Sequence, residues 1–212
     1  MPKETLRKPL TRDRVLAVAV RMADESGIEK LSMRSLAAEL GFEVMSLYNH
    51  VENKEDLLVG MTDLVAATIP LPDPSLSWRQ AVRAHAMELR AMFLQHPWAV
   101  NLWIATVPGP VRFKLMNAEL ATWNRIGLPG DEAHHAYHAV NNHVVGYHIQ
   151  SGMIPMRPDQ LDNVASELIE TLDPDRHQHV IRHIHQHLDG DHGESFEYVL
   201  DLIIDGIGTN RG

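Results

Sequence analysis

A segment near the N-terminus, Leu31–Leu58, constrains the fold more than any other part of the chain. It contains two short helical patterns separated by a glycine, and then the start of a third helix. Ser32 is a good N-cap residue, and the apolar residues that follow it share one face of a helix. Gly41 can adopt the left-handed conformation that ends a helix. This order of elements predicts a helix-turn-helix, which points to DNA binding.

The second helix of the pair is expected from Val44 to His50, and it carries the candidate reading face. Its buried side is Val44, Leu47 and Val51, which leaves a mixed polar and apolar face. Such side chains hydrogen-bond phosphates and base edges or contact the methyl group of thymine. The candidate DNA-binding residues are Met33, Arg34, Val44, Met45, Ser46, Tyr48, Asn49, His50 and Lys54.

These candidates divide by expected role. Met33 and Arg34 open the first helix and are expected to face the DNA backbone or the groove. Phosphate contacts are expected from Tyr48, His50 and Lys54, and base contacts from Val44, Met45, Ser46 and Asn49. Asn53 with Asp56 predicts the cap of the following helix, which places Lys54 in its first turn. The alternative is a small helical hairpin without a DNA role, because helix-turn-helix patterns give false positives.

The same run resembles the DNA-binding domain of TetR-family transcription regulators. The matching pieces are LSMRSLAAELGF and SLYNHVENKEDLL, preceded by a helix from about Thr11 to Ser26. The string Leu-Tyr-x-His-Val-x-x-Lys, from Leu47 to Lys54, is specific to that family. The resemblance implies a homodimer, and two-fold symmetry predicts a palindromic operator in double-stranded DNA.

Charge is distributed unevenly along the chain. The net charge is −9, of which −2 falls in the first 65 residues and −7 in the remainder. Residues 1–14 carry a local excess of three positive charges, from Lys3, Arg7, Lys8, Arg12 and Arg14 against two acidic residues. This basic arm either contacts DNA or is a solvated terminus. A narrow reading face with weak non-specific binding is therefore expected.

Composition excludes several classes of protein. The chain has no cysteine, so it has neither a disulfide framework nor thiol catalysis. No apolar run is long enough to cross a bilayer, and no signal peptide precedes the first helix. No catalytic motif is present. We expect a cytoplasmic protein that is not an enzyme and needs no cofactor.

The rest of the chain is predicted to be helical, which makes the fold all-α. Alternating prolines in IPLPDPSLS stiffen a linker, so domains are expected over 1–69 and 70–212. Ser77 with Gln80 is a capping box that opens a helix to about Gln95. Further helices are expected over 98–105, 111–126, 131–151, 159–171, 174–188 and 195–207, with Gly152 ending the longest and a polar turn over 188–194.

The second domain resembles the C-terminal domain of Tet repressors more loosely. The resemblance implies an effector-binding domain that dimerises through about Glu132–Ser151 and Ser195–Ile207, two helices from each subunit. The last helix supports this, because its apolar face is broader than one packing partner needs. The alternative is that this face fills its own core. The resemblance also implies that effector binding tilts the helix after the reading helix and releases a repressor from DNA.

Aromatic residues and methionines gather in the second domain and suggest a small apolar or aromatic effector. The candidate effector-binding residues are His85, Met92, Trp98, Trp103, Met116, Trp123, Tyr137, His138 and Asn141, with Asn142 as a further polar anchor. Each is also an ordinary core residue. Tet repressors bind tetracycline with magnesium through two histidines, and the matching positions here are near Pro70 and Trp103. These differences from the Tet repressors argue against tetracycline as the effector.

Fourteen histidines leave one alternative open. His134 with His138, and His179 with His183 and His187, have spacings that chelate zinc, nickel or copper. With no cysteine and no carboxylate at a recognisable ligand spacing, the prediction is that the chain has no dedicated metal site. The alternative is a helical metal-binding or enzymatic module that uses these helices.

Overall fold

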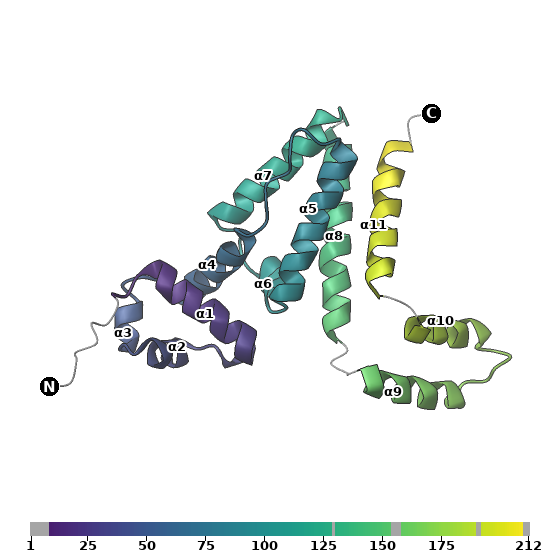
Figure 1. Ribbon diagram of the computed structural model, residues 1–212, viewed down its shortest axis with the longest axis horizontal. Helices are drawn as coiled ribbons and strands as arrows, with labels where there is room; N and C mark the ends of the chain where they lie inside the picture. The colour runs from purple at the N-terminus through teal and green to yellow at the C-terminus, as the bar shows by residue number, and fades with distance from the viewer. Residues whose placement is uncertain (1–8, 129, 154–157, 190–191, 210–212) are drawn as a thin grey trace. The chain divides into compact units, whose positions relative to one another are not determined.

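The computed structural model describes residues 9–128, 130–153, 158–189 and 192–209. All regular elements in these ranges are helices, which confirms the all-α prediction (Figure 1). The chain forms two compact units, one up to His134 and one from His135 onward. No helix in the described ranges is long and apolar enough to span a membrane.

The first unit begins with the predicted helix-turn-helix. Its elements are α1 (Arg12–Ser26), a 3-10 turn (Ile28–Lys30), α2 (Met33–Leu40), α3 (Val44–Leu47) and α4 (Lys54–Ala66). Helix α1 packs against both α2 and α4. Their shared core includes Val15, Leu36, Leu47, Leu57 and Met61, none of them more than 1% exposed.

Helix α4 is also the element on which the remainder of the first unit is built. It contacts α5 (Trp78–Gln95), α6 (Ala99–Ala105) and α7 (Pro110–Arg125), and α5 packs along α7. The proline linker thus separates two helices that touch. A domain boundary at residues 69–70 stays a prediction.

The second unit contains most of α8 (Gly130–Met153), and then α9 (Pro158–Thr171), α10 (Gln178–Asp189) and α11 (His192–Thr209). Helices α8 and α11 meet at Phe196, whose ring stacks on His143 with centroids 4.7 Å apart. The Phe196 carbonyl also accepts a hydrogen bond from His143 Nε2, at 2.9 Å. Helices α9 and α10 pack on each other.

Several predicted helix ends were wrong. The reading helix ends at Leu47 rather than His50, because His50 N–H bonds the Leu47 carbonyl in a tight turn. Helix α8 continues through Gly152 to Met153, since one glycine costs only ~1 kcal/mol in a helix interior. Helix α10 starts at Gln178 rather than Pro174, and α11 starts at His192, inside the expected polar turn.

Candidate nucleic-acid interface

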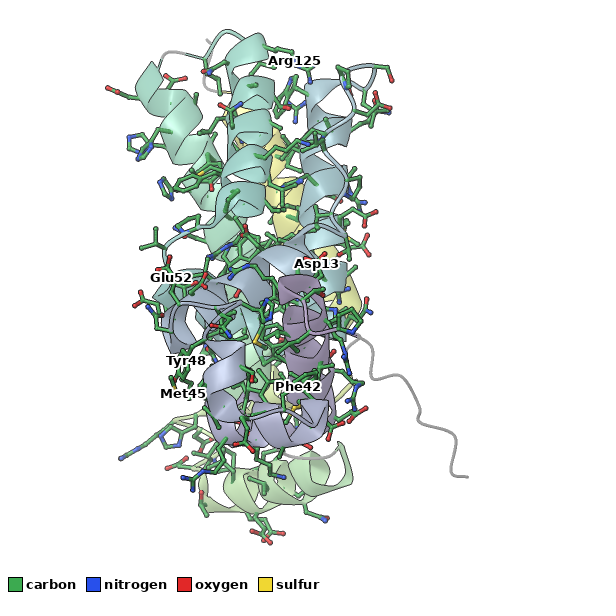
Figure 2. The ribbon with its side chains drawn as sticks, turned by 90° about the vertical axis from the view of Figure 1, so that its left-hand side faces the viewer. Asp13, Phe42, Met45, Tyr48, Glu52 and Arg125 are labelled. Carbon is green, nitrogen blue, oxygen red and sulfur yellow. The ribbon has the colours of Figure 1, made fainter. Side chains whose placement is uncertain are left out.

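The reading segment, which is α3 together with the turn after it (residues 44–51), is held by few of its residues and exposes the others. Leu47 and Val51 are buried, whereas Val44 is only half-buried. Met45 is 74% exposed and Tyr48 is 42% exposed, and both point outward from α3 in Figure 2. Asn49 and Lys54 are exposed as well, and Ser46 and His50 are half-buried. This pattern leaves these side chains accessible to DNA.

Local capping fixes the helices on either side of α3. Ser32 and Ser35 form a reciprocal capping box at the start of α2, where Met33 is half-buried and Arg34 exposed. Gly41 has a φ of 74°, the left-handed conformation expected of it. The Asn53 side chain accepts a hydrogen bond from Asp56 N–H at 2.9 Å. All three caps confirm predictions from the sequence.

An ion pair that the sequence did not reveal joins α1 to α4 and acts as a brace. It lies beside the turn over residues 48–50, which we call the reading turn. The Arg12 guanidinium donates to both Asp56 carboxylate oxygens, at 2.7 and 2.6 Å, and to the His50 carbonyl at 2.9 Å. Asp56 also accepts from Glu52 N–H. The hydrogen bonds from Arg12 hold the pKa of Asp56 below its usual value. Arg12 therefore supports the reading turn, although the sequence placed it in the basic arm.

The other basic residues of the arm fall into two groups. Arg14 lies over the Phe42 ring, 5.7 Å from its centroid, and donates to the Pro9 carbonyl at 3.4 Å. Lys3, Arg7 and Lys8 lie outside the described residues. A DNA contact from the arm stays a prediction.

Two carboxylates connect the helix-turn-helix to the helices that follow it. The first is Asp24 of α1, whose Oδ1 lies 2.8 Å from His96 Nδ1 and accepts from Trp98 Nε1 at 2.6 Å. His96 and Trp98 are both buried, and Trp98 is the N-cap residue of α6. Trp98 was predicted to bind effector, but its indole N–H is already engaged with α1.

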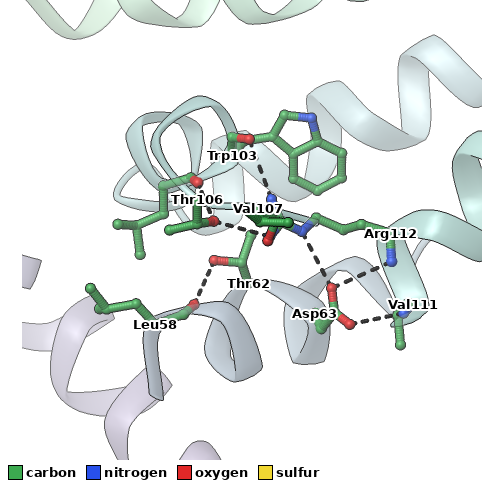
Figure 3. Close-up of polar contacts among 9 residues, drawn as sticks. Leu58, Thr62, Asp63, Trp103, Thr106, Val107, Val111 and Arg112 are labelled. Atoms are coloured by element: carbon green, nitrogen blue, oxygen red, sulfur yellow. Dashed lines mark hydrogen bonds and ion pairs between the residues drawn. The ribbon is translucent and has the colours of Figure 1, made fainter. Parts of the chain in front are cut away.

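The second carboxylate is Asp63 of α4, which lies against the start of α7 (Figure 3). It accepts from Val111 N–H at 2.8 Å and from Arg112 Nε at 3.3 Å. Arg112 is 3% exposed and reaches back to the end of α6, donating to Thr106 Oγ1 at 3.0 Å and to the Val107 carbonyl at 2.7 Å. Burial lowers the pKa of Arg112, and the nearby Asp63 opposes that shift.

A buried polar and aromatic cluster lies between α5 and α7. His85 Nε2 is 3.5 Å from the Glu119 carboxylate, and both side chains are almost fully buried. Trp123, one turn beyond Glu119, packs its ring 5.8 Å from that of Trp78. His85 Nδ1 and Trp123 Nε1 are buried and have no hydrogen-bond partner among the described residues. Glu119 and Trp78 were not singled out from the sequence, because only the α5–α7 pairing brings them to His85 and Trp123.

The remaining effector candidates lie at separate places. Met92 is buried in α5, Met116 is half-buried in α7, and the Trp103 ring meets Phe93 edge-on at 5.5 Å. In the second unit, Tyr137 and Asn141 are half-buried, and His138 and Asn142 are exposed. The Asn141 side chain donates to the Tyr137 carbonyl. The roles of these residues in effector binding stay predictions.

Among the described residues, the histidine-rich helices form no metal-binding cluster. Within the described part of the chain, no three histidine or acidic side chains are placed to hold one metal ion. His179 and His183 are exposed on α10, and the side chain of His187 lies outside the described residues.

Family models match most of the chain. Residues 15–61 match the bacterial regulatory proteins of the tetR family, and residues 71–211 match the tetracyclin repressor-like C-terminal domain.

Curated relatives that match part of the chain are also transcriptional regulators. An HTH-type transcriptional regulator of Saccharopolyspora erythraea is 38% identical over 68% of this chain and 62% of its own length. The transcriptional repressor DrrR1 of Streptomyces coeruleorubidus is 38% identical over 68% of this chain and 53% of its own. The chain thus spans less than two thirds of these two relatives.

Solved structures match along nearly the whole chain. The TetR-family protein ActR of Streptomyces coelicolor, in complex with actinorhodin, superposes with a TM-score of 0.83 at 29% identity. The alignment covers 97% of this chain and all of ActR.

Proposed function

Because this chain belongs to the TetR family, we propose that it is a ligand-responsive transcriptional repressor that binds a palindromic operator as a homodimer. The observation that carries the proposal is the reading segment itself. Met45 is exposed on α3, and Tyr48 and Asn49 are exposed on the turn after it, where the backbone is fixed by Leu47, Val51 and the Arg12–Asp56 brace. A rigid backbone with free polar and apolar side chains is what groove recognition requires.

Roles within the interface follow from position. Met45 and Asn49 project from α3 and its turn, so we assign them base contacts together with Val44 and Ser46. Tyr48, His50 and Lys54 are assigned to phosphates, and Met33 and Arg34 to the backbone or groove at the start of α2. Because Met45 is apolar, contacts with thymine methyl groups contribute to specificity alongside hydrogen bonds.

Dimerisation is assigned to α8 and α11. Phe196, Leu200 and Ile204 are buried on one side of α11, whereas Tyr198, Val199 and Leu202 are 67%, 39% and 54% exposed on the other. One helix thus has two apolar faces, and one of them is uncovered in the single chain. A second copy, packing through residues 132–151 and 195–207, would cover it with two-fold symmetry.

The effector is assigned to the second domain and to the small apolar or aromatic class. The supporting feature is the cluster of Trp78, His85, Glu119 and Trp123, which combines aromatic rings with two polar atoms that have no hydrogen-bond partner among the described residues. Buried polar atoms normally have partners, so Trp123 Nε1 and His85 Nδ1 are each expected to hydrogen-bond an effector or a water. The likeness to ActR, which was solved in complex with actinorhodin, supports a small-molecule effector.

The test is selection of random duplex DNA by the purified protein, followed by sequencing. The expected result is a palindromic consensus with half-sites at least one helical turn apart. The selected duplex then serves to screen aromatic compounds for release of the protein. Absence of enriched DNA from folded, dimeric protein would contradict the proposal.

A further inference from the structure

Helix α7 lacks a capping side chain of its own. Gly109 occupies the N-cap position and Pro110 follows it, so neither a cap oxygen nor the first N–H is available. The next free donors are the backbone N–H groups of Val111 and Arg112. Asp63 of α4 accepts from both, at 2.8 and 3.4 Å. A carboxylate from 48 residues earlier in the chain thus acts as the cap.

The space for this carboxylate exists only because residue 109 is glycine. A Cβ atom at Gly109 would overlap the Asp63 carboxylate, lying within 3.0 Å of Cγ and of both oxygens. The φ of Gly109 is −83°, which any residue adopts, so the backbone conformation itself does not require glycine. What requires glycine is the close approach of Asp63.

The same contact reaches α6 through Arg112. The guanidinium donates to the Trp103 carbonyl, Thr106 Oγ1 and the Val107 carbonyl, all at the C-terminal end of α6 or directly after it. With Asp24 bonded to Trp98 at the other end, α6 is attached to the helix-turn-helix at both ends. The Asp63 attachment is the more buried, since its side chain is 10% exposed and that of Asp24 is 31% exposed.

We propose that Asp63, seated against Gly109 and paired with Arg112, is the positioning residue that fixes α4, and with it the reading segment, against α6 and α7. Asp63 lies nine residues after Lys54, where α4 begins, a distance of about 14 Å along the helix axis. A rigid helix transmits a rotation at Asp63 to the turn before Lys54. This inference rests on the proposed function, because it names the residue through which the second domain controls the reading segment.

Two variants perturb the contact in independent ways. Asp63→Asn keeps the shape of the side chain and removes its charge, which leaves the buried Arg112 without its counter-ion. Gly109→Ala keeps the charge and displaces the carboxylate sterically. Glu88→Gln is the matched control, because Glu88 is exposed on α5 and its change removes the same charge.

The first measurement needs no DNA. The chain has no cysteine, so Ala38→Cys on α2 and Asn117→Cys on α7, both at exposed positions, give one pair of spin labels. Labelled protein is diluted with excess unlabelled chain, and pulsed electron paramagnetic resonance reads the distance within one chain. The parent and Glu88→Gln are expected to give one narrow distribution. Both Asp63→Asn and Gly109→Ala are expected to broaden it while circular dichroism shows the helices retained.

The second measurement compares the selected operator with a duplex that contains a single half-site. Both variants are expected to lose at least about tenfold in affinity for the operator, which needs both reading segments at a fixed spacing. Affinity for the half-site is expected to change less than about twofold, because α3 is untouched. If Asp63→Asn does not fold, Gly109→Ala decides the question.

A narrow parental distance in folded Asp63→Asn and Gly109→Ala would overturn the inference, whatever the DNA result. If the parent selects no DNA, the proposed function fails while the distance measurement still decides whether Asp63 positions α4. If the parent selects DNA and the distances are unchanged in both variants, the function stands and the positioning role falls.

Discussion

Tyr48 and Asp56 lie eight residues apart in the helix-turn-helix and have different roles. Tyr48 is 42% exposed, so its side chain is available to a ligand such as DNA. Asp56 is turned toward the protein and holds Arg12, which in turn holds the carbonyl of His50. A substitution of Tyr48 is expected to lower the affinity for DNA and leave the free energy of unfolding nearly unchanged. A substitution of Asp56 is expected to lower mainly the free energy of unfolding.

Tyr48→Ala is expected to weaken operator binding by at least ~1 kcal/mol, the typical loss for one specific contact. Because Tyr48 is 42% exposed and is not a core residue, the free energy of unfolding is expected to change by less than ~0.5 kcal/mol. Fluorescence anisotropy with the selected duplex measures the first quantity and urea unfolding the second. Tyr48→Phe separates the hydroxyl from the ring. Unchanged binding in folded Tyr48→Ala would remove this residue from the interface.

The pH dependence of stability follows from Asp56. Its pKa is lowered in the folded protein, so its ion pair with Arg12 stabilises above the unfolded pKa of about 3.9 and is lost as pH falls through the folded value. Asp56→Asn is expected to cost about 1 kcal/mol at pH 7, since the pair is partly exposed. Urea unfolding of both proteins from pH 7 to pH 3 measures the difference. A difference that grows toward low pH would contradict this assignment.

At the scale of elements, short-range patterns were predicted well. The caps at Ser32 and Ser77 and the stop at Gly41 involve residues within a few positions of one another, so the sequence displays them directly. The cap of α7 could not be predicted, because Pro108-Gly109-Pro110 indicates only a turn and its oxygen acceptor comes from Asp63. The Arg12–Asp56 brace and the His85–Glu119 pair escaped prediction for the same reason: each joins two helices that only the tertiary fold brings together.

The start of α4 carries its own prediction. Lys54 is exposed in the first turn of this helix, next to the reading turn, where its ammonium group can reach a phosphate. Lys54→Ala is expected to weaken all duplexes about equally and to reduce the slope of log affinity against log salt by ~1. Titrations at several salt concentrations, on operator and random duplex, measure both effects. A loss confined to the operator would instead assign Lys54 to base recognition.

At the scale of the whole molecule, the chain is acidic. A net charge of −9 opposes binding to a polyanion, so affinity for DNA must come from two reading segments used together. The proposed dimer supplies the second segment. Loss of the dimer is therefore expected to abolish operator binding even when each reading segment is intact.

Leu202→Asp tests that dependence. Leu202 is 54% exposed on α11 in the single chain, so a charge there does not disturb the packing of Phe196 or Leu200. If a second copy covers this face, a buried unpaired charge opposes assembly, and sedimentation is expected to show a monomer with unchanged helix content. Glu88→Gln, which changes a charge at an exposed position of α5 outside the proposed interface, serves as the control. A dimer that persists in Leu202→Asp would place the interface on another surface.

The anchoring of α3 affects how the DNA specificity of this protein can evolve and how it can be redesigned. Leu47 and Val51 secure the reading turn, while Met45 and Tyr48 stand clear of the core. Substitutions at the outward positions leave the core undisturbed, so target preference can drift, or be reprogrammed in the laboratory, while foldability is conserved. Duplicated copies of such a regulator can therefore diverge toward new promoters one side chain at a time, and a library randomised at these positions should yield mostly folded members.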